Sequence, residues 1–189
     1  ELSEALKDLS NDLLRDFSRD NLSSEDTIPM RISLYVSNKA NDKLYCVSRY
    51  SKNQKFCSIS NGKIYWNNGI IGKVWVEWNQ GACGIFDNNI PDTTTNKGKE
   101  YATYQLETYK ITKESIASMK MKSRLYYAYR VQSDTHNLGV ILIESTSPNR
   151  YTKDELDTII KDLEHRLLIV LKSTKNYLWQ PFTYSDNQM

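Results

Sequence analysis

The sequence predicts an α+β domain in which a mainly antiparallel sheet carries helices. Strand-like segments follow one another across short polar turns, as antiparallel hairpins do. A buried strand at 138–143 then leads into a long helix that begins near Thr152. The chain has 189 residues, of which 39% are hydrophobic and 25% charged, so it is long enough for one domain with a proper core.

The stretch 138–171 contains this strand and helix. The apolar run Leu138–Ile143 is short and ends at the polar residue Glu144, as expected of a strand buried on both faces. Thr152 and Glu155 have the spacing of a capping box, in which each side chain binds the backbone N–H of the other residue. One apolar helical face follows, made by Leu156, Ile159, Ile160, Leu163, Leu167, Val170 and Leu171.

The N-terminal residues predict a second amphipathic helix. Its leucines recur at steps of four, three and four, as in a coiled coil, although the pattern lasts only about two heptads. A helix that packs on its own domain and a helix that forms a dimer seam both fit this pattern. The residues of the face are Leu2, Leu6, Leu9, Leu13 and Phe17. We divide the chain into an N-terminal helix and linker (1–28), a main domain (29–175) and a C-terminal tail (176–189).

Shorter elements are predicted between the two helices. Strands are expected at 32–36, 44–50, 82–86 and 124–131, a helix from Gly69 to Gly81, and one or two helices over 100–121 with a break near Thr112. Polar loops are expected at 51–63 and 87–99. Long loops in compact domains are commonly functional.

Composition argues against several classes of partner. The net charge is only +2, and no basic cluster stands out, so we expect no nucleic-acid binding. No segment approaches the roughly 20 apolar residues that span a bilayer. Because the chain starts at Glu1, we expect a piece of a longer polypeptide that could include an output domain or a membrane anchor. Cys46, Cys57 and Cys83 include no close pair, which favours a reducing compartment and a cytoplasmic location.

Two passages together resemble the GAF family of sensory and regulatory domains. The segment 69–75 (Gly-Ile-Ile-Gly-Lys-Val-Trp), followed by a strand and an Asp-containing loop, resembles the middle signature of that family. The segments 123–131, 138–145 and 151–156 resemble its closing hairpin and last helix. The resemblance covers roughly residues 5–175.

The resemblance implies a GAF/PAS-like fold with a six-stranded antiparallel sheet. The N- and C-terminal helices would pack together on one face, and the other face would enclose a small-molecule pocket. It implies a non-enzymatic sensory module, a homodimer that relays its ligand state through the terminal helices. The alternative is a ligand-free module for dimerisation or protein interaction.

The elements that border the pocket in the resembling family supply an aromatic set. Its members are Phe86, Tyr101, Tyr104, Tyr127 and Tyr129, with Trp66 as a lid in a loop. Packing in the core is the other interpretation of each. Trp75 and Trp78 are expected to pack on the sheet with Ile71 and Val74. Arg49 could meet an anionic ligand, but we expect a solvated charge at a strand edge.

The resemblance leaves the cofactor unknown. Asn96-Lys97 begins a pattern like that of cyclic-nucleotide-binding members, but no matching Phe and Asp-Glu follow. No cysteine precedes a histidine, as covalent bilin attachment commonly requires, and His136 and His165 are interpreted as surface residues rather than haem ligands.

Enzymatic chemistry has little support in the sequence. The segment 80–84 (Gln-Gly-Ala-Cys-Gly) distantly resembles an element of the methionine sulfoxide reductase branch of the family, but partner cysteines at that branch's spacing are absent. No C-x-x-C or H-x-x-x-H spacing indicates zinc. We therefore expect no catalytic residue and no metal site.

Overall fold

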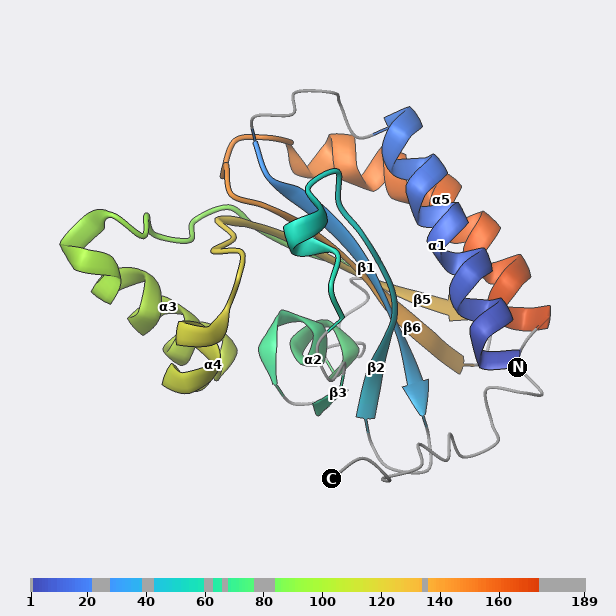
Figure 1. Cartoon of the computed structure of the whole chain (residues 1–189), viewed down its shortest axis with the longest axis horizontal. Helices are drawn as coiled ribbons and strands as arrows, with labels where there is room; N and C mark the ends of the chain where they lie inside the picture. The colour runs from blue at the N-terminus through green and yellow to red at the C-terminus, as the bar shows by residue number, and fades with distance from the viewer. Residues whose placement is uncertain are drawn as a thin grey trace.

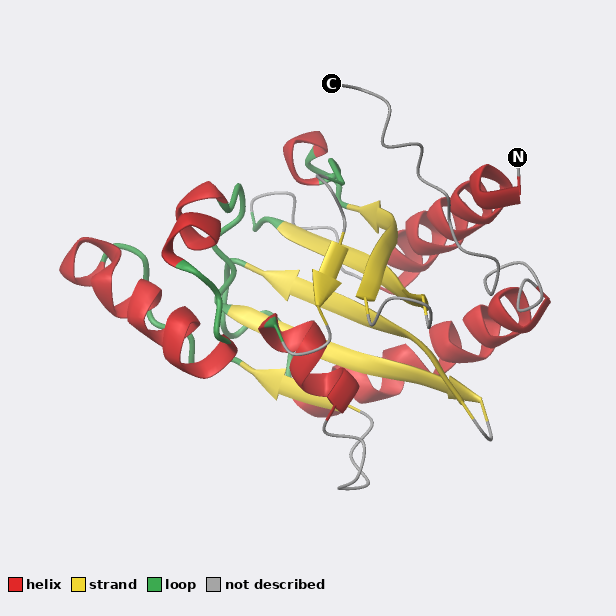
Figure 2. Cartoon of the chain, turned by 90° about the horizontal axis from the view of Figure 1, so that it is seen from below, coloured by secondary structure: helices red, strands yellow, loops and turns green. Residues whose placement is uncertain are grey.

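The computed structural model describes residues 2–21, 28–38, 43–59, 63–65, 68–76, 84–133 and 136–173. These residues form one antiparallel sheet with helices on both faces (Figures 1 and 2), which confirms the α+β class. The helices are α1 (Leu2–Asn21), η1 (Gln54–Phe56), α2 (Gly69–Val76), η3 (Thr95–Gly98), α3 (Lys99–Tyr109), α4 (Lys113–Ser118) and α5 (Lys153–Ser173). The strands are β1 (Met30–Asn38), β2 (Lys43–Tyr50), β3 (Lys63–Tyr65), β4 (Gly84–Asp87), β5 (Leu125–Ser133) and β6 (His136–Ser145).

The strands lie in the order β3-β2-β1-β6-β5-β4. The last strand in the chain, β6, lies between β1 and β5 and pairs with both. Its residues from Val140 to Ser145 are all buried, as the uninterrupted apolar run 138–143 predicts for a strand covered on both faces. The first and last strands of the main domain are therefore held together at its centre.

One face of the sheet is covered by α1 and α5, which lie side by side in both cartoon views. Alternate residues of β1 and β5 point to this face, because side chains alternate along a strand. They pack with buried residues of both helices into one cluster. Its members include Leu14, Phe17, Ile32, Leu34, Val36, Leu125, Tyr127, Val131, Ile141, Ile143, Leu156, Ile160, Leu163, Leu167 and Leu171.

The opposite face carries α2 and α3 and a second apolar cluster. Tyr35, Tyr126, Ala128, Val140 and Leu142 come from the strands, in the alternate positions. Ile71, Val74 and Trp75 of α2 pack on them, so the predicted apolar face of this helix is confirmed for these three residues. Trp78 and Gly81 lie outside the described residues.

The structure confirms the predicted start of α5 and the predicted break between α3 and α4. The Thr152 N–H donates to Glu155 Oε2 at 2.7 Å, and the Glu155 N–H donates to Thr152 Oγ1 at 3.3 Å, which completes the capping box at the start of α5. The predicted break near Thr112 is also present. Thr112 is the N-cap of α4, and Lys110 ends α3 in the left-handed conformation.

Other local predictions differ from the structure. The segment 51–63, predicted as a loop, contains η1 and the first residue of β3. Both elements are only three residues long, and so short a run offers too few positions for a periodic pattern. The segment 87–99, also predicted as a loop, includes η3 and the start of α3.

Gly139 allows the two central strands to approach closely. A Cβ atom at this position would lie 2.3 Å from the backbone oxygen of Tyr35, which is closer than such atoms can come. Glycine is therefore required at this point of β6, opposite Val36.

We predict that Thr152→Ala lowers the free energy of unfolding by about 1 kcal/mol, since it removes the N-cap of α5. Urea denaturation monitored by circular dichroism measures this change. Thr158→Ala is the matched control in the same helix, and it should leave stability unchanged or raise it, because alanine has the higher helix propensity. Equal stabilities for the two variants would show that the capping box contributes nothing.

Candidate functional site

A cavity of about 420 Å³ opens on the sheet face opposite α1 and α5. Its floor is formed by Arg31 and Tyr35 of β1 with Cys46 and Arg49 of β2. Its walls come from η1 and the residues after it, the start of α2, the turn between α3 and α4, and α4 itself. The wall residues are Lys55, Phe56, Ser58, Ile59, Asn68, Gly69, Lys110, Ile111, Thr112, Ser115, Ser118, Met119 and Lys120. Pockets for small ligands commonly have volumes of roughly 300–1,000 Å³.

A β-bulge in β2 places Arg49 on the floor of the cavity. Leu34 pairs with Ser48, but the next residue, Tyr35, pairs with Cys46, so Val47 is the extra residue of β2. Cys46 faces the cavity, and the simple alternation of a strand would turn Arg49 to the α1 side. The bulge reverses this alternation.

The residues on both sides of the bulge confirm its effect. Val47 packs in the α1/α5 cluster, and the Ser48 hydroxyl donates to Asn11 of α1 at 2.6 Å. Arg49, directly opposite Ser33, lines the cavity. Our expectation of a solvated charge at a strand edge was therefore wrong for Arg49.

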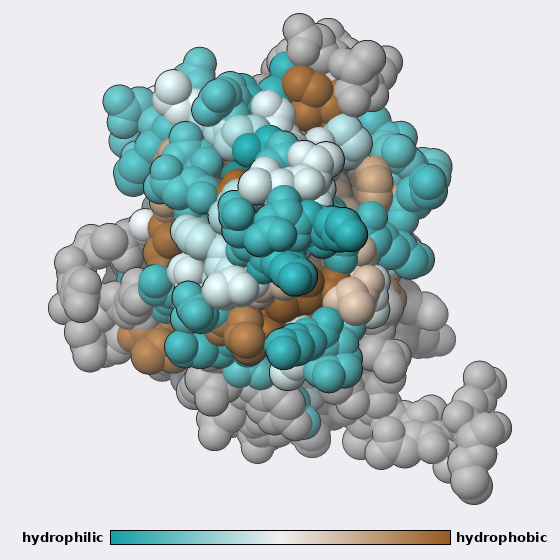
Figure 3. All heavy atoms as spheres, turned by 90° about the vertical axis from the view of Figure 1, so that its left-hand side faces the viewer, coloured by the Kyte–Doolittle hydropathy of each residue, from teal (hydrophilic) through white to brown (hydrophobic). Residues whose placement is uncertain are grey.

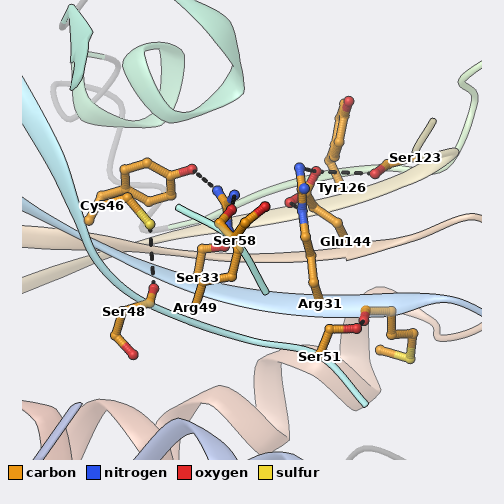
Figure 4. A network of polar contacts seen from close by, with 12 residues as sticks. Arg31, Ser33, Cys46, Ser48, Arg49, Ser51, Ser58, Ser123, Tyr126 and Glu144 are labelled. Carbon is orange, nitrogen blue, oxygen red and sulfur yellow. Dashed lines mark hydrogen bonds and ion pairs between the residues drawn. The ribbon is translucent and has the colours of Figure 1, made fainter. Parts of the chain in front are cut away.

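Three neutral oxygen atoms hold the Arg49 guanidinium. Its Nε donates to Ser33 Oγ at 2.9 Å, one terminal nitrogen to the Tyr35 hydroxyl at 3.0 Å, and the other to the Ser58 backbone oxygen at 3.0 Å. Figure 4 shows this group on the cavity side of the sheet, next to Arg31 of the adjacent strand. Arg49 is thus fixed to β1, to β2 and to the loop after η1.

Arg31 has a different kind of partner. Its Nε and one terminal nitrogen bind the two carboxylate oxygens of Glu144, the second at 2.9 Å, and the Ser123 hydroxyl donates to the same carboxylate at 3.1 Å. Arg31 and Glu144 are direct cross-strand neighbours in β1 and β6. Although burial opposes the charge, Glu144 raises the pKa of Arg31, so this guanidinium is a cation whose charge is balanced.

Solved structures with the same architecture were found by comparison, whereas no protein-family model and no curated protein matches the sequence. A type II free methionine-R-sulfoxide reductase from Thermoplasma acidophilum matches with a TM-score of 0.58 and 11% identity, over 92% of this chain and 96% of that one. The GAF domain of a phosphoenolpyruvate-protein phosphotransferase from Coxiella burnetii matches with a TM-score of 0.54 and 12% identity, over 88% and 94%. Residues 122 to 287 of a methyl-accepting chemotaxis protein match with a TM-score of 0.57 and 11% identity, over 93% and 99%.

The chain has a GAF-like fold. The resemblance of 69–75 and of the closing hairpin to GAF domains pointed to this fold, and the solved structures show it. At these identities the comparisons show the fold alone.

The GAF-like domain places the predicted pocket aromatics on two different faces of the sheet. Tyr127 and Tyr129 face α5, where their hydroxyls donate to Asp157 Oδ1 at 2.6 Å and to Glu164 Oε2 at 2.8 Å. Phe86 packs on the same α1/α5 cluster. None of these three side chains lines the cavity. Tyr127 and Tyr129 instead join the last helix to the sheet.

Tyr101 and Tyr104 lie in α3, on the cavity side of the sheet but outside the cavity lining. The Tyr104 hydroxyl donates to Asp87 Oδ2 at 2.9 Å, and the Tyr109 hydroxyl donates to the same oxygen. Burial and Asp87 raise the pKa of Tyr104 to about 12. This buried carboxylate therefore fixes α3 to the end of β4. Trp66, the predicted lid, lies outside the described residues.

The apolar face predicted for α1 is directed at least partly toward the domain itself. Phe17 is buried in the α1/α5 cluster, and Leu13 is half-buried against it. The side chains of Leu2, Leu6 and Leu9 lie outside the described residues. The C-terminal half of the predicted seam thus packs on the sheet.

Cys46 is the thiol of the cavity floor. Its S–H donates to the Ser48 backbone oxygen at 3.5 Å, and burial raises the pKa of the thiol although Arg49 opposes the shift. Burial also raises the pKa of Tyr35, so both groups are protonated near pH 7. A protonated thiol is a weak nucleophile. Cys57 is a free cysteine that directly follows η1 in the sequence. Cys83 lies outside the described residues.

The described residues show neither a metal-binding cluster nor a membrane-spanning helix. No three His, Cys, Asp or Glu side chains among them lie close enough to hold a metal ion. Within the same ranges, no helix combines the length and apolar character needed to cross a membrane.

Arg31 and Glu144 were not predicted as site residues. Glu144 was noted only as the end of the apolar run at 138–143. The two residues are 113 positions apart in the chain, and only the register of β1 against β6 brings them together.

We predict that Glu144→Gln lowers the free energy of unfolding by about 3 kcal/mol, because it leaves the Arg31 charge in a mostly buried site without a counter-charge. Chemical denaturation gives the value. The double variant Arg31→Met with Glu144→Gln should recover part of the loss. Asp162→Asn, which removes an exposed ion pair with Arg166 on α5, is the control and should change stability little. If Glu144→Gln behaves like this control, the pair does not stabilise the floor of the cavity.

Proposed function

We propose that this GAF-like domain is a non-enzymatic sensory or regulatory module that binds a small molecule. The observation that carries the proposal is the cavity of about 420 Å³ on the open face of the sheet, with a preformed polar floor. Pockets of this size that combine apolar side chains with a few fixed polar groups are typical ligand sites. Solved structures of the same fold include the GAF domain of a two-component sensor histidine kinase from Bacillus halodurans, which supports a regulatory role.

The same floor offers a connection between the cavity and the last helix. Arg31 lines the cavity and binds Glu144, which lies beside Tyr126 of β5. The next residue, Tyr127, points to the other face and binds Asp157 of α5. If α5 can pack on the sheet in two ways, a ligand with different affinities for the two conformations would shift the equilibrium between them. We propose that this shift passes the ligand state to a partner or output domain.

A reductase function is the enzymatic alternative, because free methionine-R-sulfoxide reductases share the fold. Such chemistry uses an activated thiolate. In the cavity, Cys46 is buried with a raised pKa, and its S–H is bound to a backbone oxygen. These properties favour a structural thiol and support the non-enzymatic proposal.

We predict that the 189-residue protein, purified without added ligand, shows a reproducible mass excess in native mass spectrometry that disappears on denaturation. The reason is that a cavity of this volume, with fixed polar groups on its floor, is suited to retain a ligand from the cell. The value of the excess narrows the ligand class. A clean apo mass, together with dimers that persist on dilution, would favour the ligand-free interaction module instead.

We further propose that the protein is a homodimer that associates through the outer faces of its terminal helices. Ile169 of α5 is 59% exposed although it belongs to a helix whose inner face is fully buried. A single exposed apolar residue is ordinary on a protein surface, so the proposal rests on the resemblance to GAF domains, and Ile169 marks the part of α5 at which we test it.

We predict that Ile169→Lys shifts the protein from dimer to monomer, because the substitution would bury a charge in the interface. Light scattering coupled to size-exclusion chromatography measures the mass in solution. Leu106→Lys is the matched control, because Leu106 is an exposed leucine of α3 on the other side of the sheet and should leave the dimer intact. A dimer that survives Ile169→Lys would exclude this face.

A further inference from the structure

The two arginines on the cavity floor differ in how their charges are balanced. Arg31 is bound by both oxygens of the Glu144 carboxylate. Arg49 is bound only by a serine hydroxyl, a tyrosine hydroxyl and a backbone oxygen, all neutral. Among the residues that the structure describes, no carboxylate therefore neutralises Arg49.

Arg49 also keeps donors available. A guanidinium has five N–H groups, and Arg49 uses three of them, one on each nitrogen, so each terminal nitrogen retains one N–H. A guanidinium can bind both oxygens of a carboxylate or phosphate group through a pair of such donors. Its existing bonds to Ser33, Tyr35 and Ser58 hold the group in place, which lowers the entropic cost of binding.

The charge around the cavity favours an anion as well. Lys55, Lys110 and Lys120 lie in its walls, and the lining includes no Asp or Glu among the described residues. Lys110 and Lys120 donate to neutral oxygens, those of the Glu107 backbone and the Ser58 side chain. Figure 3 shows hydrophilic and apolar residues next to one another on the side of the molecule that carries α3 and α4. A cavity with walls of one charge concentrates ligands of the opposite charge.

The start of α2 contributes to the same field. Asn68 and Gly69 line the cavity, and the Gly72 N–H already bonds back to the Asn68 backbone oxygen at 3.1 Å. The positive end of the helix dipole therefore adjoins the cavity, where it adds to the potential of Arg49. This contribution supports the argument from Arg49 but does not replace it.

Apolar side chains complete the walls. Phe56, Ile59, Ile111 and Met119 line the cavity together with the ring of Tyr35. A fully hydrated inorganic ion would leave these surfaces uncovered. The lining therefore suits a molecule that has an apolar body and one anionic end.

We propose that the ligand of this cavity is a small organic oxyanion, a carboxylate or a phosphate ester, whose anionic group is bound by Arg49. The inference rests on the proposed function and specifies the chemical class of its ligand.

The test uses the 189-residue protein and three probes of similar shape. Benzoate carries the carboxylate, phenyl phosphate carries the phosphate ester, and benzamide is the neutral counterpart of benzoate. Titrations followed by ¹H–¹⁵N NMR give the dissociation constants and show whether the shifted signals belong to cavity residues. We expect at least one anion to bind about tenfold or more tightly than benzamide, because a hydrogen bond to a charged group is worth roughly 1.5–3 kcal/mol. The stronger anion identifies the group that the site prefers.

Variants locate the effect at Arg49. Arg49→Met should weaken binding of the preferred anion about tenfold or more. Arg49→Lys keeps the charge but not the paired donors, so its affinity should lie between those of the wild type and Arg49→Met. Arg15→Met removes an exposed arginine of α1 and is the matched control, with unchanged affinity expected. Circular dichroism shows whether Arg49→Met is folded. If it is not, two comparisons still test the proposal: the affinity of Arg49→Lys against that of the wild type, and the affinity of the wild type for the anions against its affinity for benzamide.

Each outcome bears on one proposal or on both. Equal binding of benzoate, phenyl phosphate and benzamide, or full affinity in Arg49→Lys and Arg49→Met, overturns the anion proposal. A neutral ligand that copurifies would also overturn it and leave the sensory function standing. The absence of a copurified ligand, together with unchanged cavity signals for all three probes, contradicts both.

Discussion

The alternation of side chains along β1, β5 and β6 is the constraint on which the rest of the structure depends. Each of these strands is covered on both faces. Along β1, along β5 and over residues 140–143 of β6, one set of alternate residues packs under α1 and α5, and the other packs under α2 and α3 or lines the cavity. A shift of one residue in register would exchange the two sets. On β1, it would move Arg31 into the apolar cluster under the terminal helices and turn Ile32 toward the cavity. Both cores, the ion pair and the cavity therefore depend on one register.

In this GAF-like fold, one face of the sheet forms the main core and the other face carries the cavity. The face under α1 and α5 is filled by aliphatic and aromatic residues, and its polar contacts, such as Tyr127 with Asp157, join a helix to the sheet. The opposite face is filled only in part, by α2 and α3. Over β1 and β2 it remains hollow, and the polar groups there are organised by bonds between strands rather than by packing. A site built on strands holds its side chains more firmly than one built on loops.

Local features of this fold could be predicted from the sequence, and long-range features could not. The capping box of Thr152 and Glu155, the break at Thr112 and the buried strand at 138–143 depend on residues within a few positions of one another. The face to which Tyr127 and Tyr129 point could not be predicted, because residues 125–129 of β5 are apolar or aromatic at both alternating positions and give no contrast between the two faces. The direction of Arg49 could not be predicted either, because an unmarked bulge at Val47 reverses the alternation. The pairing of Arg31 with Glu144 required the register of strands from opposite ends of the main domain.

The contrast between Arg31 and Arg49 connects this structure to its proposed role. Removing a charge from water is costly, and proteins usually offset that cost with a counter-charge. The fold does so for Arg31, whose partner Glu144 is itself held by Ser123. It does not do so for Arg49 of β2, whose cross-strand neighbour Ser33 lies two residues after Arg31 in β1. There, neutral groups set the orientation of the guanidinium and leave its charge unbalanced. The bonds of Arg49 connect β2 to β1 and to the loop after η1, but they leave its charge facing the cavity. We propose that a molecule entering the cavity balances this charge, which would couple the occupancy of the cavity to the electrostatics of its floor.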